Sequence, residues 1–283
     1  MSPPWQSVPP TPTLPHPIIS SSLSVDNASL WYATYGQDLH ASTFPPVVFL
    51  HGGHISSRWW SHQIDFLSNI PSQPYTIIAV DTRGHGRSTD DVSIPLSYDL
   101  LATDVIALLD HLDIQKASVV GWSDGANTAL DLAMNFPSYV DRAFVFGANY
   151  HPSNANEAAN QSTTLPHVFS RVKPEYDEIN PEPQYEVLAG RIKAMQDSLD
   201  WGKEDFAKIP TWGGDGVEGD WPLVWIVDGD REELIQREAT LQIHDWIPGS
   251  ALVLLPHVSH FAALQDPDTF NVVLKRFLEY VKW

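Results

Sequence analysis

Five residues, Gly121-Trp122-Ser123-Asp124-Gly125, constrain the fold more than any other part of this 283-residue chain. They follow a strand-like run at 117–120 and precede a helix-like run that stops before Pro137. A G-x-S-x-G sequence between a strand and a helix predicts a sharp turn with the serine at its apex, because the glycines remove side chains that would collide there. Such a serine is a candidate nucleophile, and it needs a base, a carboxylate and an oxyanion site from elsewhere in the chain.

Candidates for these groups follow two later strand-like runs. The run 222–227 ends in an acid-rich turn that contains Asp228, Asp230 and Glu232. The run 251–256 is followed by a loop that contains two histidines, His257 and His260. Upstream, the apolar run 47–50 ends in the turn His51-Gly52-Gly53-His54. The sequence therefore predicts a site assembled from the ends of several strands.

Four motifs together resemble those of the α/β-hydrolase superfamily. They are His51-Gly52-Gly53, the segment Asp81–Ser88, the turn at Ser123 and the loop Val258-Ser259-His260-Phe261. Their order, with the serine before the acid and the acid before the histidine, is that of hydrolase triads. The resemblance spans about residues 47–265 and implies an α/β-hydrolase fold: a mainly parallel eight-stranded sheet flanked by helices, with an inserted helical cap.

The resemblance implies roles for individual residues. Ser123 is expected to be the nucleophile, and His260 the general base, because its Ser-His-Phe setting matches the family's histidine loop. His257 is expected to face solvent or pack in the loop. In related hydrolases the acid often lies three residues after the glycine that ends the strand, which favours Glu232; Asp230 and Asp228 stay open as alternatives.

The oxyanion site is expected to use two backbone N–H groups. One belongs to Asp124, directly after the nucleophile, and the other, by resemblance, to Gly53. The Asp124 carboxylate is expected to turn away from the oxyanion and to be hydrogen-bonded. The Asp81–Ser88 segment is interpreted as a structural turn. Side chains that by position are expected to line the substrate pocket are His54, Trp122, Tyr150 and Trp201.

Composition changes along the chain indicate its organisation. Residues 1–17 are proline-rich without an apolar core and predict an extended N-terminal arm rather than a secretory signal. Residues 150–215 lack a strand pattern and are expected to form the helical cap. The hydrolase core is then expected to comprise residues 18–149 and 216–283.

Charge and residue counts exclude several classes of function. The net charge is −19, and the 16 Lys and Arg residues form no run, so we expect no nucleic-acid or membrane partner. The chain has no cysteine, and neither metal-binding histidine spacing nor a phosphate-binding glycine loop is present, so no metal and no cofactor is expected. A cytoplasmic enzyme, monomeric or homodimeric, with a small-molecule substrate is expected.

These features together predict a serine hydrolase that cleaves a neutral, apolar carboxylic ester or lactone through an acyl-enzyme. A carbon–carbon bond hydrolase uses the same triad and is an alternative, as are cofactor-free peroxidase-like relatives. A hydrolase-fold small-molecule receptor is the alternative from another class. The sequence does not identify the substrate, because specificity depends on the shape of the cap pocket.

Overall fold

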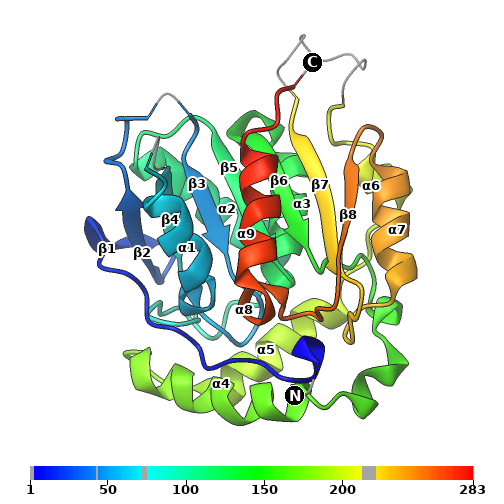
Figure 1. The fold of residues 1–283 in the computed structure, drawn as a ribbon. Coiled ribbons are helices and arrows are strands. Elements are labelled where there is room, and N and C mark those ends of the chain that lie inside the picture. The colour runs from blue at the N-terminus through cyan, green and yellow to red at the C-terminus, as the bar shows by residue number, and fades with distance from the viewer. Residues whose placement is uncertain (1–2, 43, 72–74, 212–220, 283) are drawn as a thin grey trace.

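The computed structural model describes residues 3–42, 44–71, 75–211 and 221–282. At its centre is one sheet of eight strands in the order β1-β2-β4-β3-β5-β6-β7-β8 (Figure 1). The strands are β1 (Ile19–Val25), β2 (Ala28–Gly36), β3 (Val47–Leu50), β4 (Thr76–Val80), β5 (Ala117–Trp122), β6 (Val140–Phe146), β7 (Leu223–Gly229) and β8 (Ala251–Leu255). Strand β2 runs antiparallel to β1 and β4, and the other neighbouring pairs are parallel. The expected mainly parallel, eight-stranded sheet is confirmed.

Helices cover both faces of the sheet (Figure 1). Those packed on one face are α1 (Ser61–Ser68), α8 (Ala262–Gln265) and α9 (Pro267–Leu278). Those on the other face are α2 (Tyr98–His111), α3 (Asp124–Asn135) and α7 (Arg237–Trp246). Among the short 3-10 helices, η1 (Pro4–Gln6) lies in the N-terminal arm, and η2 (Ser57–Trp60) and η3 (Pro137–Tyr139) lie in connections between strands and helices.

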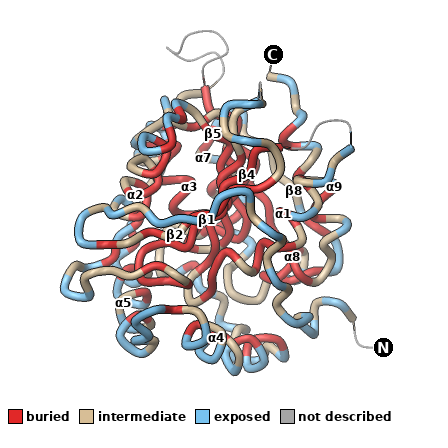
Figure 2. The backbone as a smooth tube through the Cα atoms, turned by 90° about the vertical axis from the view of Figure 1, so that its left-hand side faces the viewer, coloured by how far each residue is buried: buried red, intermediate tan, exposed pale blue. Residues whose placement is uncertain are grey.

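One large apolar cluster lies on each face of the sheet, and a third, smaller cluster joins α2 to the helices between β6 and β7. Val47 and Phe49 of β3 join one large cluster, and Val48 and Leu50 join the other, because successive side chains of a strand point to opposite faces. A strand covered on both faces needs apolar residues at every position, which explains the uninterrupted runs in the sequence. Figure 2 shows buried residues concentrated in the sheet and exposed ones on the outer turns of the helices.

Helix boundaries follow from capping side chains. Ser97 accepts a hydrogen bond from the N–H of Leu100 at the start of α2, and Asp266 does the same for Thr269 at the start of α9, where Pro267 is the first residue. Asp104 of α2 is a charged residue that is nevertheless buried. It is 5% exposed, because the guanidinium of Arg83 pairs with its carboxylate through two hydrogen bonds.

A helical insertion, defined here as residues 150–211 between β6 and β7, lies across one end of the sheet (Figure 1). Its helices are η4 (Pro152–Asn154), η5 (Glu157–Gln161), α4 (Leu165–Ile179), α5 (Tyr185–Asp197) and α6 (Lys203–Phe206). The predicted domain boundary between residues 215 and 216 falls outside the described residues.

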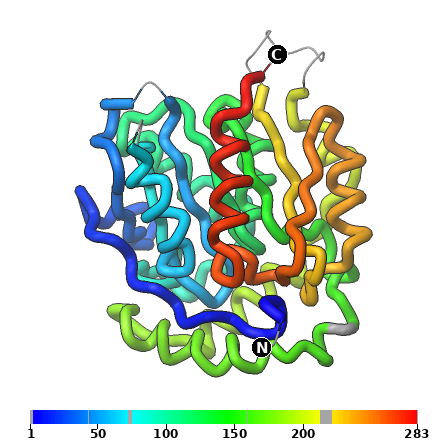
Figure 3. Tube along the Cα trace, in the orientation of Figure 1, coloured from blue at the N-terminus to red at the C-terminus, as the bar shows by residue number. Residues whose placement is uncertain are grey.

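The N-terminal arm runs along α4 and reaches the loop that follows β8 (Figure 3). Arg171 of α4 donates hydrogen bonds to the carbonyls of Val8, at 3.4 Å, and Pro9, at 2.6 Å. At the other end, the Trp5 ring stacks on His257 with ring centroids 5.5 Å apart. In the ranges that the structure describes, no helix is long and apolar enough to cross a membrane.

Candidate active site

Ser123 lies at the apex of a sharp turn between β5 and α3. Its φ of 57° and ψ of −120° are a strained combination for a residue with a side chain. A Cβ atom at Gly121 would lie 2.2 Å from the carbonyl oxygen of Gly125, and one at Gly125 would lie 2.3 Å from that of Leu50. Both flanking glycines are therefore required by close packing of the turn against the chain, as the sequence pattern predicts.

His260 forms a buried pair with Glu232. The Nδ1 atom of His260 lies 2.8 Å from Oε2 of Glu232, and each side chain is 3% exposed. The other carboxylate oxygen of Glu232 accepts hydrogen bonds from the N–H groups of Leu234, at 2.6 Å, and Ile235, at 3.1 Å. With Glu232 as acceptor, Nδ1 carries the ring proton and Nε2 is left as the basic nitrogen.

The other two acids of the same turn have different partners. Asp230 accepts a hydrogen bond from the backbone N–H of His257 at 2.6 Å. Asp228 accepts one from Thr240 at 2.5 Å. The geometry therefore pairs His260 with Glu232, while His257 is exposed in the loop beside Trp5.

The surroundings shift the pKa values of this pair in opposite directions. Burial lowers the pKa of His260, but the charge and hydrogen bond of Glu232 outweigh it, so the pKa is raised above 6.5. Burial raises the pKa of Glu232, but the charge and hydrogen bond of His260 prevail and lower it. The acid is therefore ionised at neutral pH and supports a basic imidazole.

Ser123 and His260 face the same cavity, which has a volume of about 180 Å³. Its lining is mostly apolar and includes four residues of one face of α4. The lining residues are Gly52, Gly53, His54, Ile55, Trp122, Ser123, Leu165, Val168, Phe169, Val172, Gln196, Leu234, His260 and Phe261. Among the described residues, no hydrogen bond joins the Ser123 hydroxyl to His260. Hydrogen bonds in active sites are often long in ligand-free structures and shorten when substrate binds.

The turn that contains Gly53, one of the two predicted oxyanion donors, lies close to Ser123. A Cβ atom at Gly52 would lie 3.1 Å from Cβ of Ser123. The 51–54 turn therefore packs directly on the sharp turn at residues 121–125, which we call the elbow. In the described chain, the backbone N–H groups of Gly53 and Asp124 donate to no other protein group. Two backbone N–H groups near Ser123 that have no partner among the described residues are available as hydrogen-bond donors to a negatively charged oxygen.

The Asp124 side chain connects the elbow to the helical insertion. Its Oδ1 accepts from the Tyr98 hydroxyl at 2.7 Å, and Gln196 of α5 donates to Oδ1 at 3.2 Å and Oδ2 at 3.0 Å. The carboxyl group is hydrogen-bonded, as expected. Its Oδ2 atom, however, lies close to the 51–54 loop, from which it was expected to point away: a Cβ atom at Gly53 would lie 2.3 Å from this oxygen. Burial raises its pKa.

Two of the four predicted pocket residues line the cavity. They are His54 and Trp122. Tyr150 and Trp201 lie outside it, because each packs on another aromatic ring: Tyr150 on Trp246, with ring centroids 4.7 Å apart, and Trp201 on Tyr98, at 5.5 Å.

Helix α4 contributes four apolar residues to the cavity that were not predicted, at positions 165, 168, 169 and 172. Their spacing is that of one helical face and was the available signal. Pro166 and Pro174 obscured it, although a proline at the first turn of a helix, as at Pro166, is compatible with the helix.

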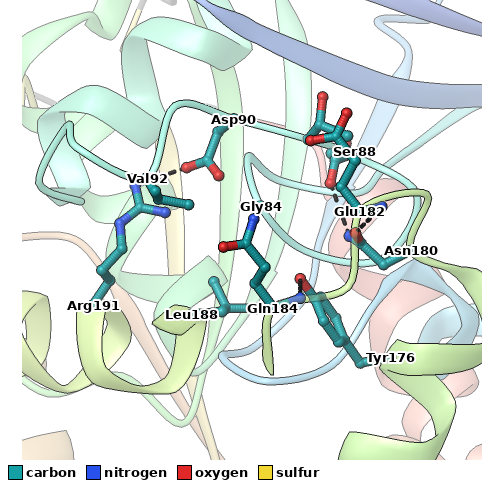
Figure 4. Close-up of a pocket in the computed structure, with 11 residues that line it drawn as sticks. Gly84, Ser88, Asp90, Val92, Tyr176, Asn180, Glu182, Gln184, Leu188 and Arg191 are labelled. Carbon is teal, nitrogen blue, oxygen red and sulfur yellow. Dashed lines mark hydrogen bonds and ion pairs between the residues drawn. The ribbon is translucent and has the colours of Figure 1, made fainter. Parts of the chain in front are cut away.

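The Asp81–Ser88 segment holds loops in place. Asp81 accepts hydrogen bonds from Ser57 and from Arg87, and Arg83 pairs with Asp104. Figure 4 shows a small polar pocket, about 20 Å³, where this segment meets the insertion. There Asn180 donates to the carbonyl of Ser88 at 3.0 Å, and Arg191 pairs with Asp90 at 2.7 Å. These contacts fix the insertion beside the site.

The described residues offer no cluster of side chains that could bind a metal ion. Within the described ranges, no group of three or more His, Cys, Asp or Glu side chains is placed to hold a metal ion. The side chains at the apolar cavity include the serine and an imidazole that is paired with a carboxylate.

Comparison with known proteins agrees with this geometry. The model of the alpha/beta hydrolase family matches residues 47–272. The chain belongs to the alpha/beta hydrolase family. Among curated proteins, this hydrolase is 28% identical over 273 residues to the serine hydrolase BPHL of Homo sapiens, a match that covers 93% of this chain and 87% of that protein. It is 37% identical over 124 residues to the 3-oxoadipate enol-lactonase 2 of Acinetobacter baylyi, which covers 44% of this chain and 43% of the other.

Solved structures share the fold of this alpha/beta hydrolase. The meta-cleavage product hydrolase of Pseudomonas fluorescens superposes with a TM-score of 0.72 at 21% identity, covering 91% of this chain and 96% of that chain. Similarity at this level of identity establishes the architecture, and the chemistry has to be argued from the residues of the site.

Proposed function

We propose that this alpha/beta hydrolase cleaves neutral, apolar carboxylic esters or lactones through an acyl-enzyme, with Ser123, His260 and Glu232 as its triad. The observation that carries the proposal is that the elbow serine and the Glu232-paired imidazole face one apolar cavity. The curated relatives named as a serine hydrolase and an enol-lactonase support the reaction class. The apolar lining, with no ionic group facing Ser123 from α4, favours a neutral substrate.

In the proposed reaction, Nε2 of His260 takes the proton of the Ser123 hydroxyl as the oxygen attacks the substrate carbonyl. The N–H groups of Gly53 and Asp124 stabilise the oxyanion, where removal of one such donor typically costs about 3–4 kcal/mol. His260 then gives its proton to the departing alkoxide. A water molecule, deprotonated by the same nitrogen, attacks the acyl-enzyme and releases the acid. Glu232 holds the imidazole and stabilises its protonated form.

The helical insertion is proposed to cover the substrate cavity. Helix α4 supplies Leu165, Val168, Phe169 and Val172 to the cavity wall above the serine. As a cap, these side chains exclude water from the acyl-enzyme and select the apolar group of the substrate. The proposed enzyme works without a cofactor.

Turnover of chromogenic short-chain esters and of lactones tests the proposal. Ser123→Ala is expected to abolish turnover, and Ser170→Ala, an exposed serine of α4, is the matched control that is expected to retain it. A fluorophosphonate probe is expected to label the native protein on the peptide that contains Ser123. Absence of both turnover and labelling would contradict the proposal. A single-turnover burst with retained ligand would instead favour the receptor alternative.

A further inference from the structure

Asp228 is a second buried carboxyl group directly behind the proposed triad acid. It lies near the end of β7 and is 1% exposed. Its Oδ1 accepts a hydrogen bond from the backbone N–H of Gly229 at 2.8 Å, and its Oδ2 accepts one from Thr240 of α7 at 2.5 Å. A hydrogen bond also joins its side chain to that of Glu232. The proposed mechanism does not use this group.

Two carboxyl groups in hydrogen-bond contact need a proton between them. If both were ionised, two like charges would face each other in a buried site without water to screen them. Two oxygens without a proton also cannot form the hydrogen bond, since ionised carboxylates only accept. One of the two residues is therefore a neutral acid.

The surrounding donors decide which residue is ionised. Glu232 accepts from the N–H groups of Leu234 and Ile235 and from Nδ1 of His260, and each of these bonds favours its charged form. Asp228 has one backbone N–H, from Gly229, and the hydroxyl of Thr240, and no ion pair to a cationic side chain of the described residues. The charge accordingly belongs on Glu232 and the proton on Asp228.

We propose that Asp228 is a neutral carboxylic acid whose O–H donates a hydrogen bond to Glu232 and so fixes the ionised acid behind His260. Asp228 is then a positioning residue: it acts on Glu232 and touches neither substrate nor serine. The inference rests on the proposed function, in which Glu232 is the acid of the triad. A neutral donor suits this place, because it orients Glu232 without adding a second negative charge.

Other ionisable groups around the pair agree with this charge distribution. Glu233 accepts a hydrogen bond from the backbone N–H of His260 at 3.1 Å and one from Thr164 at 2.8 Å, and burial raises its pKa. The charge of Asp124, next to Ser123, also raises the pKa of His260. Three carboxyl groups, those of Glu232, Glu233 and Asp124, therefore lie around one imidazole. Burial and the charge of Glu232 raise the pKa of Asp228 well above its ordinary value.

Infrared spectroscopy tests the protonation state without any need for turnover. Protein carrying 13C in its aspartate carboxyl groups is expected to show, at neutral pH, an isotope-shifted carbonyl band of a protonated acid. This band is expected to disappear in Asp228→Asn and to persist in Asp124→Asn, the control for the other buried aspartate at the site. Absence of the band from the native protein, or its persistence in Asp228→Asn, overturns the proposal even if the enzyme proves inactive.

Kinetics test the positioning role. Asp228→Leu removes the donor and is expected to lower kcat by about 10-fold to 100-fold, by analogy with the loss of an outer partner that orients a metal ligand. Asp228→Asn keeps an N–H donor of the same size and is expected to be at least tenfold more active than the leucine variant. An asparagine variant as inactive as Glu232→Gln overturns the proposal, because Asp228 would then act as an anion. Should the leucine variant fail to fold, the asparagine variant and the infrared band still decide.

Discussion

The Gln196 side chain of α5 donates hydrogen bonds to both carboxyl oxygens of Asp124, the residue that follows Ser123. A helix of the insertion is thereby joined to the turn that carries the proposed nucleophile and one proposed oxyanion donor. Since the carboxyl group of Asp124 is buried, its hydrogen-bond partners matter for both stability and the position of the elbow.

Gln196→Ala is expected to lower the free energy of unfolding by about 1–3 kcal/mol, because a buried carboxyl group loses one of its two side-chain partners. Urea unfolding followed by tryptophan fluorescence measures the change. Lys193→Ala is the control on the same helix: its ion pair with Asp197 is exposed, with side chains 74% and 57% accessible, so a change within about 0.5 kcal/mol is expected. Equal effects of both variants would contradict the contact.

The pH dependence of ester hydrolysis is expected to follow His260. The base has to be neutral to accept the serine proton, and the net pKa of His260 is raised above 6.5, so kcat/KM is expected to fall as the pH drops through a value above 6.5. In Glu232→Gln the raising charge is lost while burial remains, which moves the pKa of His260 downward. NMR titration of 13C-labelled histidine, assigned with His260→Ala, measures both values. A pKa unchanged by Glu232→Gln would show that the pair is not formed.

Phe169 is expected to contribute to substrate binding rather than to stability. It lines the cavity but is 53% exposed. Phe169→Ala is expected to reduce kcat/KM for an ester with a bulky apolar acyl group about tenfold, equivalent to about 1.4 kcal/mol of apolar contact. Phe44 is 47% exposed and lies away from the cavity, so Phe44→Ala is expected to leave kcat/KM unchanged. The comparison across acyl chains of increasing bulk is the measurement.

Removal of residues 1–14 is expected to loosen α4. The arm is held by Arg171, by the hydrogen bond of Thr11 to Glu175 at 2.7 Å, and by packing of Val8 and Leu14 on the core. The thermal midpoint is expected to fall by about 2–4 °C for each kcal/mol of these contacts that is lost. Hydrogen exchange is expected to become faster in α4 and to stay unchanged in α3, which serves as the internal reference. Unchanged exchange in α4 would contradict a stabilising role of the arm.

The sequence by itself determined the local geometry of the site and the class of fold. Glycines at 121 and 125 permit one close-packed turn around Ser123, and uninterrupted apolar strands require cover on both faces of the sheet. These features depend on residues that are neighbours in the chain, so a single sequence is sufficient to predict them. The order of the four motifs then placed the chain in its family.

Only the tertiary structure decided which distant side chains meet. Asp228, Asp230 and Glu232 lie within five positions of each other. The family's spacing favours Glu232, but it comes from resemblance and left both aspartates open. Packing of the loop after β8 against the turn after β7 brings Glu232, and neither aspartate, to Nδ1 of His260. The cavity wall was likewise set by how the insertion docks on the core. That docking depends on long-range contacts such as those of Asn180, after α4, and Arg191, in α5, which leave no periodic trace in the sequence.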